Sequence, residues 1–291
     1  MSKNFPSPLE LIRRHNLNLK KSLGQNLLID TNHLARIAAA AELTKEDTVL
    51  EIGPGLGALT HQLAERAGRV VAVELDQRLI PVLREQFANQ PHVSFVHGDI
   101  LELSPAALIQ PQLPQETGAA SDTTEYKVVA NLPYYITSAV IRHILERADS
   151  RPTLAVLLVQ REVAQRMVAQ PGDMSLLAVS VQFYARPRAL HTVPAGAFLP
   201  APKVDSSVMR LDLHQQPAVP DVDPTQFFRI VRAGFGQRRK QLRNSLSAGL
   251  SCKKEDADLW LNAAGVEPSR RPQTLSISEW GELTRQVYGE K

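Results

Sequence analysis

The segment Asn131-Leu132-Pro133-Tyr134 combines the residue types best suited to chemistry on a nucleobase. An adenine amino group is a poor nucleophile, because its lone pair is delocalised into the ring. The Asn131 side-chain oxygen could accept a hydrogen bond from one N–H of this amino group. The Leu132 main-chain carbonyl, which Pro133 holds in a rigid turn, could accept from the other, and together they would make the lone pair available. Tyr134 offers a flat surface for stacking the base. The segment therefore indicates amino-group methylation, although a simple strand-ending turn uses the same residue types.

A glycine-rich turn lies earlier in the chain, at residues 51–57, between an apolar run and a helical stretch. Glycines such as Gly53 and Gly55 allow a tight turn and a close approach of the backbone to a ligand. The spacing is G-x-G-x-G, whereas the dinucleotide fingerprint is G-x-G-x-x-G. This difference argues against a dehydrogenase and favours a nucleoside-type ligand without phosphates. A structural turn without any ligand remains the alternative.

Two carboxylates follow at the ends of the next two apolar runs. Glu74 could accept both hydroxyls of a ribose, and Asp76 is a rival for that role. Asp99 could accept from the 6-amino group of a bound adenine, with Ile100 covering the ring, although Gly98-Asp99 could also be only a turn. The glycine turn, Glu74 and Asp99, one at each strand end, together predict a site for S-adenosylmethionine. No metal is required.

The elements that would position these residues are short apolar runs separated by helical stretches. The runs are residues 48–52, 69–74, 92–97, 127–130 and 153–159, with a further strand expected at 204–213. Strands that alternate with helices predict a parallel α/β sheet with right-handed crossovers. Ligands bind beyond the carboxyl ends of such strands, so Gly53, Glu74, Asp99 and Asn131 should line one crevice.

The chain of 291 residues is long enough for two domains. Three prolines between residues 214 and 224 predict a boundary there. We expect a catalytic domain at 1–214 and a small, wholly helical domain at 215–291. The prolines and polar residues at 105–125 predict a mobile loop.

Charge and composition bound the classes of partner. The net charge is only +3, but residues 229–243 carry six Lys or Arg and no acid. Such a stretch suggests RNA as a polyanionic partner, and a solvated helix surface is the alternative. The candidate RNA contacts are Arg238, Arg239, Lys240 and Arg243. Residues more suited to the helix core than to base contacts are Phe227, Phe228, Ile230 and Val231.

Nothing in the sequence indicates a membrane or an oxidising compartment. No run approaches the roughly 18 apolar residues that span a bilayer. Residues 1–15 lack the apolar segment of a secretory signal, and Cys252 is the single cysteine. We therefore expect a cytoplasmic protein without internal disulfides. A monomer is the default expectation.

These motifs, with residues 21–28, 198–206 and 235–244, resemble the ribosomal RNA adenine N6,N6-dimethyltransferases, specifically the bacterial small-subunit type. The resemblance covers the chain from about Lys20 to its end. It implies a Rossmann-like class I methyltransferase domain with a mostly parallel seven-stranded sheet. It implies dimethylation of two adjacent adenosines in the 3′-terminal hairpin loop of 16S rRNA, in the immature small ribosomal subunit. The residues that it implies as S-adenosylmethionine contacts are Asn26, Leu28, Gly53, Glu74, Asp99 and Asn131.

The same resemblance draws attention to Phe198 and Lys203. Phe198 could stack on the target base opposite Tyr134, or simply pack in the core, and Lys203 could meet a phosphate. The sequence departs from the family at Leu27, where phenylalanine is usual, and in a longer, acidic 105–125 loop. Neither departure removes a group that the mechanism needs.

Two other functions remain open on the same fold. An Erm-type methylase would act on large-subunit RNA, but residues 198–206 and 235–244 favour the small-subunit type. A ribosome-assembly or transcription factor would bind nucleic acid with little catalysis, and the intact segment 131–134 argues against it.

Overall fold

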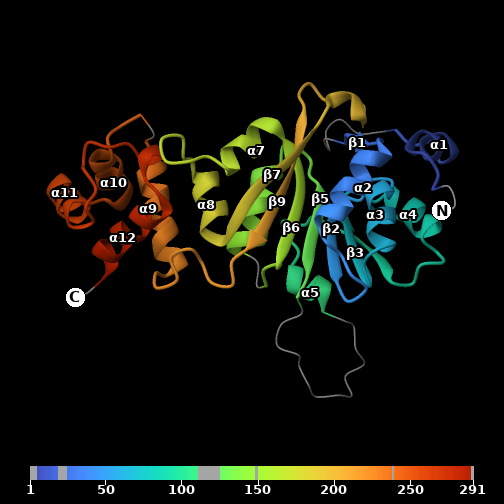
Figure 1. Ribbon diagram of the computed structural model, residues 1–291, viewed down its shortest axis with the longest axis horizontal. Coiled ribbons are helices and arrows are strands. Elements are labelled where there is room, and N and C mark those ends of the chain that lie inside the picture. The colour runs from blue at the N-terminus through green and yellow to red at the C-terminus, as the bar shows by residue number, and fades with distance from the viewer. Residues whose placement is uncertain (1–4, 19–24, 111–124, 148–149, 238, 290–291) are drawn as a thin grey trace, which may run out of the picture. The chain divides into compact units, whose positions relative to one another are not determined.

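The computed structural model describes residues 5–18, 25–110, 125–147, 150–237 and 239–289. The chain forms two compact units (Figure 1). Unit 1 comprises Met1–Ala164 and Arg188–Leu213, and unit 2 comprises Gln165–Pro187 and His214–Lys291. None of the described helices is long and apolar enough to cross a membrane.

A mostly parallel sheet of seven strands in the order β4-β3-β2-β5-β6-β9-β7 forms the centre of unit 1. The pairs β2–β3, β3–β4, β2–β5 and β5–β6 are parallel, whereas β9 runs antiparallel to β6. The strands are β2 (Thr48–Ile52), β3 (Arg69–Glu74), β4 (Val93–His97), β5 (Lys127–Asn131), β6 (Leu154–Gln160), β7 (Ala185–Val193) and β9 (Ser206–Leu213). The predicted mostly parallel sheet of seven strands is thus confirmed.

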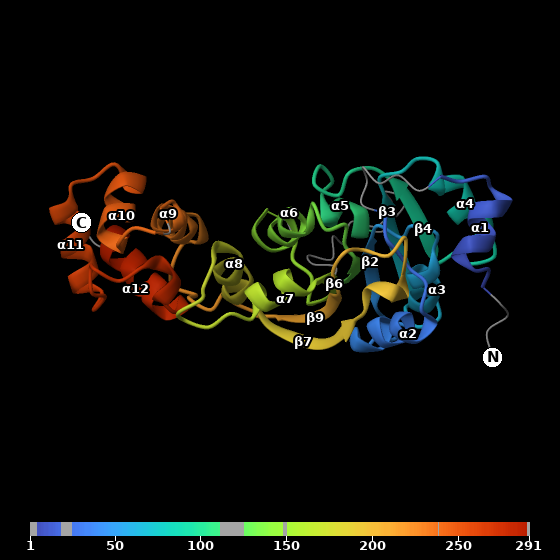
Figure 2. The ribbon, with the colours of Figure 1, turned by 90° about the horizontal axis from the view of Figure 1, so that it is seen from above.

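The central strands are apolar because both faces of the sheet are covered. Figure 2 shows α2 and α3 on one face and α5 and α6 on the other. The helices of this part of the chain are α1 (Pro8–Arg14), α2 (Thr31–Ala40), α3 (Ala58–Ala64), α4 (Leu79–Gln86), α5 (Pro105–Ile109), α6 (Thr137–Arg142), the π-helix η2 (His143–Arg147), α7 (Arg161–Met167) and the short η3 (Ala195–Ala197).

A second, two-stranded sheet joins two segments that lie far apart in the sequence. Strand β1 (Leu27–Leu28) pairs antiparallel with β8 (Phe198–Leu199), and Leu28 lies opposite Phe198. The amide of Ile29 extends the pairing by donating to the Ala197 carbonyl at 2.9 Å. The segment before α2 is therefore fixed to the segment before β9.

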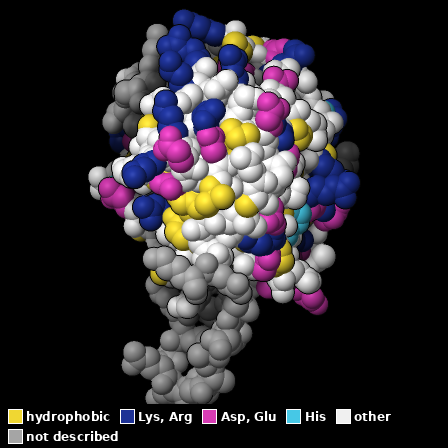
Figure 3. Space-filling view, turned by 90° about the vertical axis from the view of Figure 1, so that its left-hand side faces the viewer, with side chains coloured by type: hydrophobic (Ala, Val, Ile, Leu, Met, Phe, Trp, Pro, Cys, Tyr) yellow, Lys and Arg dark blue, Asp and Glu magenta, His cyan; other side chains and the backbone are white. Residues whose placement is uncertain are grey.

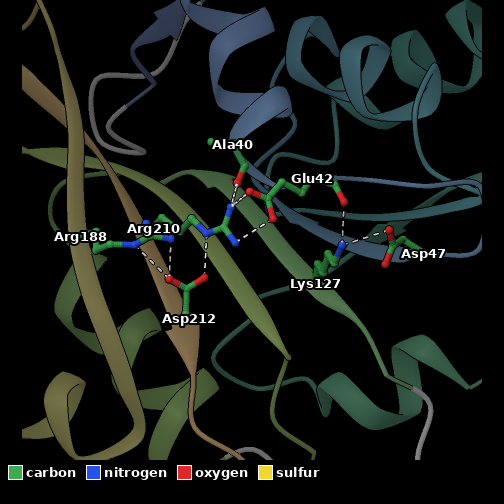
Figure 4. A network of polar contacts seen from close by, with 7 residues as sticks. All are labelled: Ala40, Glu42, Asp47, Lys127, Arg188, Arg210 and Asp212. Atoms are coloured by element: carbon green, nitrogen blue, oxygen red, sulfur yellow. Dashed lines mark hydrogen bonds and ion pairs between the residues drawn. The ribbon is translucent and has the colours of Figure 1, made fainter.

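Polar contacts fasten α2 to the sheet at the amino end of β5 (Figure 4). Arg210 of β9 donates to the Ala40 carbonyl at 2.9 Å and pairs with Glu42 and Asp212 at 2.5 and 2.7 Å. Lys127, the first residue of β5, donates to Asp47 at 3.0 Å. These hydrogen bonds and charges lower the pKa of the Glu42 carboxyl and raise that of Arg210. Since Asn131 is at the other end of β5, this network lies at the edge of the sheet opposite to it.

Unit 2 is built from helices around an aromatic cluster. Phe183 stacks on Phe227 with ring centroids 4.3 Å apart and meets Phe228 edge-on at 5.2 Å. Phe227 and Phe228 of α9 are buried, as are Ile230 and Val231, which confirms their predicted core-facing side. The helices are α8 (Leu176–Tyr184), α9 (Pro224–Phe235), α10 (Leu242–Leu250), α11 (Lys254–Ala263), the short η4 (Pro272–Thr274) and α12 (Ile277–Tyr288).

Two features differ from the sequence predictions. The expected boundary after residue 214 leaves out residues 165–187, which join unit 2 because Phe183 of α8 packs on α9. The start of the expected 105–125 loop is helical, because Ser104 accepts from the Ala107 amide at 3.0 Å and Pro105 occupies the first turn of α5. Most of the rest of that loop, residues 111–124, lies outside the described part of the chain.

Candidate active site

A pocket opens at the carboxyl ends of the parallel strands in unit 1. It contains about 1050 Å³ of empty space, part of which is open solvent. The predicted site residues that line it are Asn26, Leu28, Gly53, Gly55, Glu74, Asp99, Asn131, Leu132, Pro133 and Tyr134. Parallel strands bring their carboxyl ends to one edge of the sheet, so residues as far apart in the sequence as Gly53 and Tyr134 converge here.

The glycine turn after β2 has a backbone that other residues rarely adopt. Gly53 and Gly55 have φ angles of 72° and 58°, in the left-handed region that favours glycine. A Cβ at Gly55 would lie 2.9 Å from Cδ2 of Leu27, so a side chain there would also collide with β1. The turn can therefore present its main chain to a ligand, with Leu27 beside Gly55 on the same pocket wall.

Glu74 ends β3 and is only 6% exposed. Its Oε2 accepts from the Gly55 amide at 3.1 Å, and its Oε1 accepts from the Asp76 amide at 2.8 Å. Burial raises the pKa of this carboxyl, and the two backbone hydrogen bonds act against that rise. Each carboxylate oxygen keeps further lone pairs, so Glu74 can still accept from ligand hydroxyls.

Asp76, the rival of Glu74, does not line the pocket. Its carboxylate pairs with the Arg78 guanidinium at 2.6 Å and accepts from the Gln25 amide at 3.0 Å. The hydrogen bonds from Arg78 lower the pKa of Asp76 to about 2. The geometry thus gives Asp76 a role in fixing the chain around the pocket and leaves Glu74 as the carboxylate on the pocket wall.

Asp99 follows β4 and lines the pocket beside the buried side chain of Ile100. Its Oδ1 accepts from the Leu101 amide at 2.9 Å, which holds the carboxylate in a local turn. Of the described residues, none donates to its Oδ2. Asp99 therefore does form the local turn that was the alternative to ligand binding, but this turn leaves one carboxylate oxygen available to a ligand.

Asn131, the last residue of β5, has its side-chain amide oriented by the segment before β1. Its Nδ2 donates to the Asn26 carbonyl at 3.1 Å. Since a carbonyl can only accept, this bond assigns Nδ2 to Asn26, and among the described residues none donates to Oδ1, which is left as the acceptor of the amide. The orientation is the one that acceptance from an amino group requires.

The next residues supply the other predicted groups. Leu132 is buried, and among the described residues none donates to its main-chain carbonyl, which can serve as the second acceptor. The Pro133 carbonyl accepts from the Ile136 amide at 3.2 Å and from the Thr137 hydroxyl at 3.1 Å, which closes the turn. Tyr134 is half-buried on the pocket wall, and a 2.7 Å hydrogen bond joins its hydroxyl to that of Ser206. Burial raises the pKa of this phenol.

The structure does not place Phe198 where base stacking needs it. Its ring is 3% exposed, belongs to the core and does not line the pocket. The pairing of β8 with β1 explains this position, because it sets Phe198 opposite Leu28, whose side chain is also buried. The core-packing alternative fits this geometry, and the prediction of a stacking surface does not.

Several pocket residues were missed by the sequence predictions. Leu75 and Tyr135 line the pocket and are 42% and 58% exposed. Both directly follow a predicted residue, Glu74 or Tyr134, so their place next to a predicted residue was the available signal. Glu51, which is not among the residues that line the pocket, was also missed by the sequence predictions. It is fully buried in β2, and burial raises its pKa to about 8.

The predicted RNA contacts differ in how available they are. Lys203, Arg239 and Lys240 are exposed, whereas Arg238 lies outside the described residues. Arg243 is half-buried and forms an ion pair with Asp258 of α11. Figure 3 shows basic and acidic side chains intermixed over one end of unit 2, so this face is not uniformly basic. Among the described residues, no three His, Cys, Asp or Glu side chains are grouped so that they could hold a metal ion.

The sequence profile described as ribosomal RNA adenine dimethylase matches residues 16–283. The ribosomal RNA small subunit methyltransferase A of Dehalococcoides mccartyi is 47% identical and covers 97% of this chain and 92% of its own length. The protein of the same name from Anoxybacillus flavithermus is 42% identical and covers 99% of this chain and 98% of itself.

Solved structures are similar as well. The 23S rRNA methyltransferase ErmE is 29% identical with a TM-score of 0.65, covering 90% of this chain and 100% of its own. A dimethyladenosine transferase from Plasmodium falciparum is 23% identical with a TM-score of 0.69, covering 88% of this chain and 95% of its own. The predicted class I methyltransferase fold is confirmed.

Proposed function

Because the chain belongs to the ribosomal RNA adenine dimethylase family, we propose that it methylates the exocyclic N6 of adenosines in small-subunit ribosomal RNA. We further propose that it adds two methyl groups to each of two adjacent adenosines in the 3′-terminal hairpin loop of 16S rRNA. The observation that carries the chemistry is the orientation of Asn131, whose Nδ2 is held by Asn26 and whose Oδ1 is free to accept. The names of the relatives that are 42–47% identical favour the small subunit over the large one.

The residues of the pocket fit S-adenosylmethionine, which would supply an electrophilic methyl group. The positive φ angles of Gly53 and Gly55 let the turn approach the ligand closely. Glu74 would accept from the ribose hydroxyls, and Oδ2 of Asp99 would accept from the adenine amino group of the cofactor. Asn26 and Leu28 line the same pocket and would close over it from the amino-terminal side.

The substrate adenine would be held by the segment 131–134. Asn131 Oδ1 and the Leu132 carbonyl would accept hydrogen bonds from the two N–H groups of its amino group, while Tyr134 stacks on the ring. The amino nitrogen would bond to the methyl carbon as the carbon–sulfur bond breaks, with the electron pair of that bond staying on sulfur. The surplus proton would then leave the nitrogen to water. The target base must be unstacked first, which costs less in a loop than in a duplex.

Transfer of a labelled methyl group tests this proposal. The protein would be incubated with labelled S-adenosylmethionine and with small or large ribosomal subunits from cells that lack the modification. We expect label in the small subunits only, and none with Asn131→Ala. Label in the large subunits would replace the proposal with an Erm-type activity. Label in neither would favour a factor that binds RNA without catalysis.

A further inference from the structure

Unit 2 contains a shallow hollow between α9 and α10, and it is not lined by the predicted RNA contacts that the structure describes, namely Lys203, Arg239, Lys240 and Arg243. It has about 700 Å³ of empty space, including open solvent. The residues that line it are Arg229, Arg232, Ala233, Gly236, Gln237, Ser245, Ala248 and Gly249. The described part of its walls therefore combines two guanidinium groups with small or neutral polar residues and includes no acid.

Close packing of two small residues shapes the hollow. A Cβ at Gly249 of α10 would lie 2.6 Å from the Cα and Cβ of Ala233 of α9, so only glycine allows the helices to come this close. Ser245 is buried and donates its hydroxyl to the Gln237 main-chain carbonyl at 3.2 Å. Apart from the two arginines and Gln237, the described residues that line the hollow are small, so the hollow stays open to a ligand.

The two arginines of the hollow differ from other arginines of unit 2. Arg229 and Arg232 lie one turn apart on α9 and are exposed, and no described residue accepts a hydrogen bond or an ion pair from either. The Arg232 guanidinium carbon lies 6.0 Å from the centroid of the Phe228 ring, within range of a cation–π contact that leaves its N–H donors unused. By contrast, the arginines at 243, 270 and 285 are paired with acids.

The surrounding chain adds no compensating charge, since residues 224–250 contain no Asp or Glu. We propose that this hollow binds backbone phosphates of the RNA substrate through Arg229 and Arg232, with the Gln237 amide as a neutral donor. This inference rests on the proposed function, because it takes ribosomal RNA as the ligand. Guanidinium groups match the paired oxygens of a phosphate, and none of the described residues that line the hollow is aromatic and could stack a base. The contact would therefore be independent of the RNA sequence.

The test is the double variant Arg229→Gln/Arg232→Gln, which removes both charges while keeping long side chains that favour a helix. Binding to unmethylated small ribosomal subunits would be measured over a range of KCl concentrations. We expect the Kd to rise about tenfold and the slope of log K against log salt to flatten by about 1.4–1.8, the value for two phosphate contacts. In methyl transfer, the KM for subunits should rise while kcat stays the same. Arg229→Lys/Arg232→Lys should recover most of the slope, because it restores the charge.

Lys254→Gln/Arg271→Gln is the matched control, because it removes two charges from exposed positions of unit 2 outside the hollow. The proposal is wrong if the hollow variant keeps the wild-type Kd and slope. It is equally wrong if the control weakens binding as much, since overall charge would then explain the effect. Failure of the proposed function would look different, because the wild type would transfer no methyl group to small subunits while its salt slope could still be measured.

Discussion

The pocket of unit 1 and the arginines on α9 and α10 of unit 2 have their functional groups positioned in different ways. In the pocket, main-chain atoms fix the side chains: two amides bind Glu74, and a carbonyl orients Asn131. On α9 and α10, neighbouring side chains determine whether an arginine is already paired with an acid or is available to a ligand. Arg243 is taken up by Asp258, while Arg229 and Arg232 stay unpaired among the described residues. The topology of a parallel sheet therefore determines the first site, whereas tertiary neighbours determine which cations remain available at the second.

The largest effect should come from breaking the pocket at Asn131. Asn131→Ala removes one of the two acceptors for the amino group, and we expect methyl transfer to fall by roughly 100-fold or more. Binding of small subunits should change less than about twofold, because the RNA contacts of unit 2 are untouched. Filter binding and label incorporation on the same preparation would measure both. Ser138→Ala, at an exposed position of α6, is the control. Normal transfer by Asn131→Ala would disprove the mechanism.

The next effect should be on cofactor affinity. Glu74→Gln replaces one carboxylate oxygen by an N–H donor that cannot accept from a ribose hydroxyl or from the Gly55 amide. Loss of a hydrogen bond to a charged group costs about 1.5–3 kcal/mol, so calorimetry should show S-adenosylhomocysteine binding weakened by roughly 10- to 100-fold. Asp76→Asn should weaken it less, because Asp76 is not on the pocket wall. The reverse order would assign the ribose to Asp76.

A buried carboxyl beneath the pocket should make the stability of unit 1 depend on pH. Burial raises the pKa of Glu51 to about 8, far above its value of 4.5 in an unfolded chain. Its contribution to stability is therefore fully present below pH 4.5 and is lost as the pH rises through 8. Glu51→Gln cannot ionise, so the free energy of unfolding of the variant relative to wild type should increase between pH 5 and 8.5 by on the order of 2–5 kcal/mol, and its Tm should rise relative to wild type over the same range. A constant difference in Tm would show that Glu51 does not titrate in this range.

The smallest effect on RNA binding should come from replacing Arg243, which already forms an ion pair with Asp258. Since Arg243 is bound to Asp258, Arg243→Ala should change RNA affinity less than about twofold and lower stability by less than about 1 kcal/mol. The exposed Arg239, changed to Ala, should weaken RNA binding several-fold. Equal losses of RNA affinity would mean that RNA displaces Asp258 from Arg243.

The difference between the pocket of unit 1 and the arginines of unit 2 also explains what could be predicted from the sequence. The strand ends were found because apolar runs and the residues that follow them are local signals, and parallel topology then brings Gly53, Glu74, Asp99 and Asn131 together. Phe198 could not be placed from sequence, because its burial depends on pairing with Leu28, 170 positions away. Arg243 looked available for the same reason, since nothing local reveals its partner Asp258. The place of residues 165–187 in unit 2 likewise depends on the contact of Phe183 with Phe227.

The most direct test of the catalytic role is to find which atom is methylated, and how often. After reaction with unmethylated small subunits, the 16S rRNA would be cut by a base-specific ribonuclease, and the modified oligonucleotides would be sequenced by mass spectrometry. We expect two N6,N6-dimethyladenosines that are adjacent in the 3′-terminal hairpin loop, and far less of either after the same incubation time with Asn131→Ala. Methyl groups on a ring nitrogen, a ribose or another base would contradict the role that the geometry assigns to Asn131 and Leu132.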